Sequence, residues 1–66
     1  MTISLNGENT DPRGATTVAE LVRVLNLPAP TLLIEHNGVA LNRREWPDRT
    51  LAEGDRIELI KIVAGG

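Results

Sequence analysis

Residues 17–26, TVAELVRVLN, hold the pattern that decides the fold. Thr17 and Glu20 have the spacing of a capping box, in which a hydroxyl and a carboxylate satisfy free N–H groups at the start of a helix. Apolar residues then recur at i, i+3, i+4 and i+7, the spacing of one helix face: Val18, Leu21, Val22 and Leu25. Asn26 is a suitable C-cap, and the prolines at 28 and 30 prevent continuation. The sequence therefore predicts one amphipathic helix over 17–26.

Strand-like patterns lie on both sides of this helix. On the N-terminal side, residues 1–6 alternate between apolar and polar side chains, which is typical of a half-buried strand. Residues 6–9, Asn-Gly-Glu-Asn, have the composition of a turn. Residues 10–16 contain Pro12 and Gly14 and few apolar side chains, so we expect a poor strand at an edge of the sheet there.

Three further strands are expected after the helix. Residues 32–36 alternate and end at Asn-Gly, residues 39–41 follow that tight turn, and residues 56–63 are rich in β-branched side chains. Residues 42–49 are polar except for a tryptophan and indicate a loop or one helical turn. This order predicts an α+β domain in which a mixed sheet of four to five strands carries one helix on one face. The first and last strands hold the most apolar residues, so we place them side by side in the sheet centre.

The composition excludes several classes of function. The chain has 66 residues, which fits a single domain over 1–66. It has no cysteine and one histidine, so we expect no disulfide, no thiol nucleophile and no metal site. Lys and Arg total 7 against 9 Asp and Glu, and one residue is aromatic, which argues against nucleic-acid binding. No pair of carboxylates has an acid–base arrangement, so we expect no catalytic residue and no enzyme activity on this chain.

No segment has the pattern of a signal peptide or a membrane span. The N-terminus lacks a basic stretch followed by an apolar one. The longest nearly apolar run, 57–66, is interrupted by Glu58 and Lys61 and is too short to cross a bilayer. We therefore expect a cytoplasmic monomer that docks on larger partners.

The last strand has apolar residues on both faces, although one helix covers only one face of a sheet. We expect Ile60 and Ile62 on the uncovered face. Leu33 alternates out of phase with its neighbours and joins them. An exposed apolar patch on a small protein usually marks a partner surface. The alternative is a central strand whose open face is partly covered by loops. We call Leu33, Ile60 and Ile62 the sheet patch.

The sequence ends in Ala64-Gly65-Gly66, which we expect to be a flexible tail over 64–66. Glycine has no Cβ, so Gly65 and Gly66 fit a slot too narrow for a side chain. From Val63 an extended tail reaches about 10 Å. Its distinctive reactive group is the terminal carboxylate of Gly66, for which we expect no processing step. A carboxylate is a poor acyl donor, so a partner would first convert it to an acyl-adenylate with ATP. The alternative is an ordinary frayed end.

The other conspicuous side chains are interpreted as structural. Spacing shows no catalytic partner for His36, which we interpret as a partly buried structural histidine. Trp46 is interpreted as a packing anchor rather than a partner hot spot. The pair Arg43-Arg44 is interpreted as solvated rather than as a site for an acidic partner. Glu53 and Asp55 are expected to shape a turn.

Six segments together resemble the ThiS family of β-grasp (ubiquitin-like) sulfur carriers of thiamine thiazole biosynthesis. In chain order they are Ile3-Ser4-Leu5-Asn6-Gly7-Glu8, Thr17-Val18-Ala19-Glu20-Leu21, Ile34-Glu35-His36-Asn37-Gly38, Arg43-Arg44-Glu45-Trp46, Glu53-Gly54-Asp55-Arg56-Ile57-Glu58 and Ala64-Gly65-Gly66. The chain departs from the family pattern at two places. Leu41-Asn42 stands where relatives often have Val-Pro, and His36 stands where they often have an apolar residue.

The resemblance implies a β-grasp fold and a specific chemistry at Gly66. An E1-like (ThiF-like) enzyme would adenylate its carboxylate. A persulfide donor, a cysteine desulfurase or a rhodanese-like protein, would then supply sulfur for a thiocarboxylate. Thiazole synthase (ThiG-like) would take that sulfur. Gly65 and Ala64 would give access, and no cofactor is expected on the chain because the partner consumes the ATP.

Three alternatives stay open, because the tail does not separate them. One is a sulfur carrier for molybdopterin or another pathway. The second is a ubiquitin-like protein modifier that forms isopeptide bonds. The third is a non-covalent β-grasp interaction module whose terminal glycines are incidental.

Overall fold

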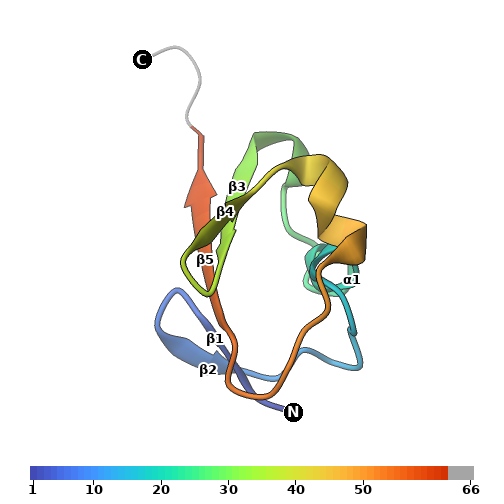
Figure 1. Ribbon diagram of the computed structural model, residues 1–66, viewed down its shortest axis with the longest axis vertical. Helices are drawn as coiled ribbons and strands as arrows, with labels where there is room; N and C mark the ends of the chain where they lie inside the picture. Colours follow the sequence, from blue (N-terminus) through green and yellow to red (C-terminus); the bar gives the residue numbers. More distant parts are fainter. Residues whose placement is uncertain (63–66) are drawn as a thin grey trace.

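A computed structural model describes residues 1–62, and residues 63–66, including the expected tail, lie outside this range. The elements, which Figure 1 shows, are β1 (Ile3–Leu5), β2 (Glu8–Thr10), α1 (Val18–Val24), the 3-10 helix η1 (Ala29–Thr31), β3 (Leu32–His36), β4 (Val39–Leu41), the 3-10 helix η2 (Arg43–Asp48) and β5 (Arg56–Lys61). Within residues 1–62, no helix is long and apolar enough to cross a lipid bilayer.

The five strands form one mixed sheet in the order β2-β1-β5-β3-β4. β1 runs parallel to β5, and the other pairs are antiparallel. The predicted α+β class is confirmed, as is the adjacency of the first and last strands. In Figure 1, α1 and η2 lie together on one side of the sheet. Within residues 1–62, the opposite face of the sheet carries no helix.

The helix forms where its capping residues and apolar spacing predict. The Thr17 hydroxyl accepts a hydrogen bond from the N–H of Glu20 at 3.2 Å. The Glu20 carboxylate accepts from the N–H and the hydroxyl of Thr16, one residue earlier than in a standard capping box. α1 ends at Val24, and Asn26 follows with φ of 55°, in the left-handed region that terminates helices. The helix is therefore two residues shorter at its C-terminal end than predicted.

The second strand lies at an edge of the sheet, as predicted, but its predicted bounds were wrong. Asn6 and Gly7 have φ of 50° and 85°, and this two-residue turn alone reverses the chain. Residues 8–10 therefore pair directly back on β1, with Leu5 opposite Glu8. Residues 11–16, expected to be an edge strand, instead contain a second turn at Arg13 and Gly14, both with positive φ.

The later elements agree more closely with the bounds predicted from the sequence. β3 and β4 have the predicted bounds and are joined by Asn37-Gly38, which also has positive φ at both residues. Residues 43–48 form a 3-10 helix where a loop or one turn was expected. β5 ends at Lys61, and Val63, the last residue of the predicted strand, lies outside the described residues.

The core lies between α1 with η2 on one side and the sheet on the other. Trp46 is buried and packs there, as expected of a packing anchor. The buried apolar residues are Ile3, Ala15, Val18, Leu21, Val22, Leu32, Ile34, Leu41, Trp46, Leu51 and Ile57. Burial on this one face fixes the register of β1, β3, β4 and β5, each of which has at least one buried side chain, because side chains alternate between faces.

Candidate functional site

The sheet patch lies on the face that α1 does not cover. Leu33 on β3 is the direct Cα partner of Ile60 on β5. Leu33, Ile60 and Ile62 are each close to half exposed, at 48%, 49% and 49%. Their neighbours Ile34 and Ile57 point the other way into the core. The structure thus brings Leu33 and Ile60 to the same side of two adjacent strands, and Ile62 follows directly after β5.

Two glutamates border the sheet patch. Glu35 and Glu58 are Cα partners on β3 and β5, two residues from Leu33 and Ile60 on each strand, and so share their face. Like charges placed directly opposite each other destabilise a sheet. Arg56, two residues from Glu58 on β5, shares this face as well. The uncovered face therefore combines an apolar area with two facing carboxylates and one cation.

The sheet patch includes Ile62, the last residue that the structure describes. The N–H of Ile62 donates a hydrogen bond to the carbonyl oxygen of Thr31 at 2.7 Å, and Lys61 pairs with Leu32. The chain is therefore held against η1 and β3 up to its last described residue. The predicted tail residues Ala64, Gly65 and Gly66 lie outside the described residues.

His36 has the partner that spacing failed to indicate. It is buried, and its Nε2 lies 2.7 Å from Oδ2 of Asp55. The Nε of Arg49 donates to Nδ1 of His36 at 3.2 Å. Because Nδ1 accepts from Arg49, the proton on Nε2 is donated to Asp55. Neither ring nitrogen is free to act as a base toward a substrate, so the arrangement is structural.

Asp55 joins two segments of the chain through its carboxylate. It accepts hydrogen bonds from His36, from Nδ2 of Asn37 at 3.0 Å and from the N–H of Ala52 at 2.8 Å. Burial raises the pKa of Asp55, but these hydrogen bonds lower it by more, so the pKa lies below its usual value of 3.8. This carboxylate holds the loop before β5 against the β3–β4 hairpin.

The pair Arg43-Arg44 was expected to be solvated, but Arg43 makes contacts within the protein. Arg43 lies over the ring of Trp46, with 5.6 Å between the guanidinium carbon and the ring centroid. It also donates a hydrogen bond to the carbonyl oxygen of Ala29. Arg44 is exposed. The sequence reasoning missed this contact because Ala29 and Arg43 belong to different elements.

A pocket of about 430 Å³, which no sequence pattern indicated, lies on the helical side of the molecule. It opens between α1 and η2, with Trp46 in its wall. Among residues 1–62, no cluster of three or more His, Cys, Asp or Glu side chains is arranged to hold a metal ion.

Comparison with known proteins identifies the family of the chain. A crystal structure of the thiamine biosynthesis protein ThiS from Geobacter metallireducens matches with a TM-score of 0.84 and 30% identity, covering 100% of both chains. A solution structure of a thiamine biosynthesis protein from the same organism matches with a TM-score of 0.77 and 30% identity, covering 100% of this chain and 88% of that one. The expected ubiquitin-like β-grasp fold is therefore confirmed.

A sequence relative is also found outside these structures. The uncharacterized protein ycf40 of Trieres chinensis is 25% identical over 65 residues, which cover 98% of this chain and 89% of that protein. The ThiS family model matches residues 3–66, almost the whole sequence. The chain belongs to the ThiS family.

Proposed function

We propose that this protein is the sulfur carrier for synthesis of the thiamine thiazole ring, with the sulfur held on the C-terminal carboxyl group of Gly66. Membership of the ThiS family and the likeness to a thiamine biosynthesis protein support this function. The observation that carries it is the exposed sheet patch, which includes the last described residue, Ile62, four positions before Gly66 in the sequence. A partner that covers the patch would need to span only these four positions to reach the reacting carboxyl group.

The chemistry uses the terminal carboxylate and no side chain of this protein. A carboxylate oxygen of Gly66 attacks the α-phosphorus of ATP, and pyrophosphate leaves to give an acyl-adenylate. The terminal sulfur of a persulfide attacks the acyl carbon, and AMP leaves. A thiol then reduces the resulting acyl disulfide, which releases the thiocarboxylate and forms a disulfide with the donor. The absence of cysteine from the sequence fits a carrier that holds sulfur on its backbone terminus.

The proposed partners are a ThiF-like adenylating enzyme, a persulfide donor (a cysteine desulfurase or a rhodanese-like protein) and a ThiG-like thiazole synthase. Their docking faces would be apolar opposite Leu33, Ile60 and Ile62, since these side chains are half exposed. They would also carry a basic group opposite Glu35 and Glu58, because such a group relieves the repulsion between the facing carboxylates. Ala64 and Gly65 would let the terminus enter a narrow catalytic slot.

Substitution of the sheet patch tests the docking part of this proposal. We expect Ile60→Ser to raise the KM for the carrier about tenfold in an ATP–pyrophosphate exchange assay with the adenylating enzyme, with kcat unchanged. Val39→Ser is the matched control, because Val39 is equally exposed at 48% and its strand register places it on the other face. An equal KM for both variants and the unchanged protein would contradict docking through the patch.

Substitution of the tail tests the chemical part. We expect Gly65→Val, or removal of Gly66, to abolish exchange while the thermal midpoint stays unchanged. A large fall in the midpoint would instead indicate that the terminus is structural. Exchange that survives removal of Gly66 would contradict the assignment of the chemistry to Gly66, and an unchanged protein that supports no exchange would favour a non-covalent interaction module.

A further inference from the structure

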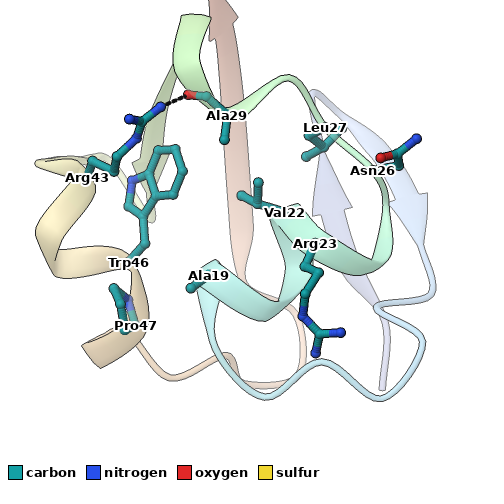
Figure 2. A pocket seen from close by; sticks show the side chains of 9 residues that line it. All are labelled: Ala19, Val22, Arg23, Asn26, Leu27, Ala29, Arg43, Trp46 and Pro47. Carbon is teal, nitrogen blue, oxygen red and sulfur yellow. Dashed lines mark hydrogen bonds between the residues drawn. The ribbon is translucent and has the colours of Figure 1, made fainter.

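The pocket between α1 and η2 is a second candidate binding surface, on the side of the molecule opposite the sheet patch. Its volume of about 430 Å³ falls within the usual range for ligand sites of roughly 300–1,000 Å³. Figure 2 shows Ala19 and Val22 of α1 facing the indole ring of Trp46 on η2. The lining residues are Ala19, Val22, Arg23, Asn26, Leu27, Ala29, Arg43, Trp46 and Pro47.

The ionisable side chains that line this pocket are both positively charged. Its two ionisable lining residues are Arg23 and Arg43, which lie at opposite ends of the hollow in Figure 2. Within residues 1–62, neither arginine forms an ion pair. Hydrogen bonds from Thr16 and, to a smaller extent, the nearby Arg23 guanidinium lower the pKa of the Glu20 carboxyl, so Glu20 offsets part of the Arg23 charge without forming an ion pair with it. Glu45 accepts a hydrogen bond from the N–H of Asn42. A protein with an overall charge of −2 therefore presents an apolar hollow between two cations.

The Arg43 side chain in the pocket wall is held in position by contacts within the protein. Arg43 is held by its hydrogen bond to the Ala29 carbonyl and by its contact with the Trp46 ring. A guanidinium restrained in this way loses less conformational entropy when it binds a carboxylate. Arg23 and Asn26 are exposed at the rim, whereas Val22 and Trp46 are buried. An apolar centre with a polar, solvent-facing rim is the anatomy of a protein interface rather than of an enclosed small-molecule site.

We propose that this pocket docks a short segment of a partner protein that places an apolar side chain between two carboxylates. The apolar side chain fills the space beside Val22 and Trp46, and the carboxylates meet Arg23 and Arg43. Because the sheet patch lies on the opposite face, this segment binds while a partner occupies the patch. The proposal does not depend on the chemistry at Gly66, and its test does not involve the tail.

Trp46 makes the test direct, because it is the only tryptophan of the chain and gives a single indole N–H signal in a nitrogen–proton correlation spectrum. The indole nitrogen is buried and has no hydrogen-bond partner among the described residues. The probe is the peptide acetyl-Glu-Asp-Leu-Leu-Asp-Glu-amide. We expect it to shift the Trp46 indole signal and the amide signals of Val22 and Leu27, with a Kd on the order of 1 mM or tighter.

Two control peptides separate the apolar and the charged contributions. One has serine in place of both leucines, and the other has lysine in place of all four acidic residues. We expect each to bind at least about tenfold more weakly. Equal binding of the serine peptide would overturn the apolar part of the proposal, and equal binding of the lysine peptide would overturn the charged part.

Charge reversal at the rim locates the site on the protein. We expect Arg23→Glu to weaken binding about tenfold and Arg23→Gln to weaken it less. Arg56→Glu is the matched control, because it makes the same charge change beside buried Ile57 and so on the other face of β5, and it should leave the Kd within about twofold. The far-ultraviolet circular dichroism spectrum of each variant checks that it is folded.

Three outcomes would overturn the proposal. The first is the absence of any shift at Trp46, Val22 and Leu27 with the acidic peptide. The second is a set of shifts confined to Leu33 and Ile60, which would place peptide binding on the sheet patch. The third is a concentration-dependent shift of the Trp46 signal without peptide, which would show that a second copy of the chain occupies the pocket.

Discussion

Replacing Asp55 by asparagine tests whether its buried hydrogen-bond network holds the loop before β5 against the rest of the sheet. The three partners of the carboxylate, His36, Asn37 and the N–H of Ala52, are all donors in the structure. An amide has one acceptor oxygen and one NH2 group. In either orientation, the asparagine NH2 therefore faces a donor, and the negative charge that strengthened all three bonds is lost.

The expected loss of stability follows from these contacts. A hydrogen bond to a charged group contributes about 1.5–3 kcal/mol, and a buried donor left unpaired costs about 1–3 kcal/mol. The Asp55 side chain is only 12% exposed and that of His36 is 7% exposed, so water does not replace the lost acceptor. We expect Asp55→Asn to lower the free energy of unfolding by about 2–3 kcal/mol, out of roughly 3–10 kcal/mol for a domain of this size. The melting temperature should fall by about 10–20 °C.

The assay is thermal and urea unfolding followed by circular dichroism at pH 7. Glu53→Gln is the matched control, because it makes the same chemical change two residues away on a side chain that is 71% exposed. Glutamine keeps an acceptor for the N–H of Thr2, so this variant should lose less than about 0.5 kcal/mol. Equal melting temperatures for the Asp55 and Glu53 variants would refute the account of the network.

The pH dependence gives a second check on Asp55. Its pKa is lowered in the folded protein, so its stabilising effect is complete above the usual value of 3.8 and is lost as the pH falls through the folded value. The difference in unfolding free energy between the unchanged protein and Asp55→Asn should therefore shrink below about pH 3.8. A difference that stays constant from pH 7 to pH 2 would contradict the charged role of this side chain.

The remaining predictions concern packing and helix capping. Ile57 is fully buried in the middle strand, so Ile57→Ala should lower the free energy of unfolding, measured in urea, by about 3–4 kcal/mol. Ile60→Ala should lower it by less than about 1 kcal/mol, because Ile60 is half exposed. Similar losses for the two variants would argue against the assignment of the two faces. Thr17→Ala removes the acceptor for the N–H of Glu20 and should cost about 1 kcal/mol in thermal unfolding. Thr17→Ser keeps that acceptor, and a loss equal to that of the alanine variant would argue against capping.

The parts of the fold that depend on local spacing could be predicted from the sequence. The helix has its capping threonine and its apolar face within one short segment, and β3 and β4 are bounded by Asn37-Gly38. The second strand was misplaced because the composition of residues 6–9 suggested a longer turn. The structure shows that Asn6 and Gly7 suffice, since both adopt positive φ.

The candidate site could be predicted only where the alternation of side chains along a strand determines which residues are exposed. The exposure of Leu33, Ile60 and Ile62 follows from the strand period and from the presence of one helix. The partner of His36 was missed because Asp55 lies 19 residues later, and nothing local joins them. The pocket was missed for the same reason, because it exists only where the non-adjacent elements α1 and η2 come together.

The intact mass of the protein shows whether the carboxyl group of Gly66 carries sulfur. The protein is incubated with ATP, a ThiF-like adenylating enzyme and a persulfide donor, and its mass is then measured, with fragmentation to locate any change. The account predicts a gain equal to the exchange of one oxygen for one sulfur atom, located on Gly66. An unchanged mass, under conditions in which the same enzyme and donor convert another ThiS-family carrier, would contradict it.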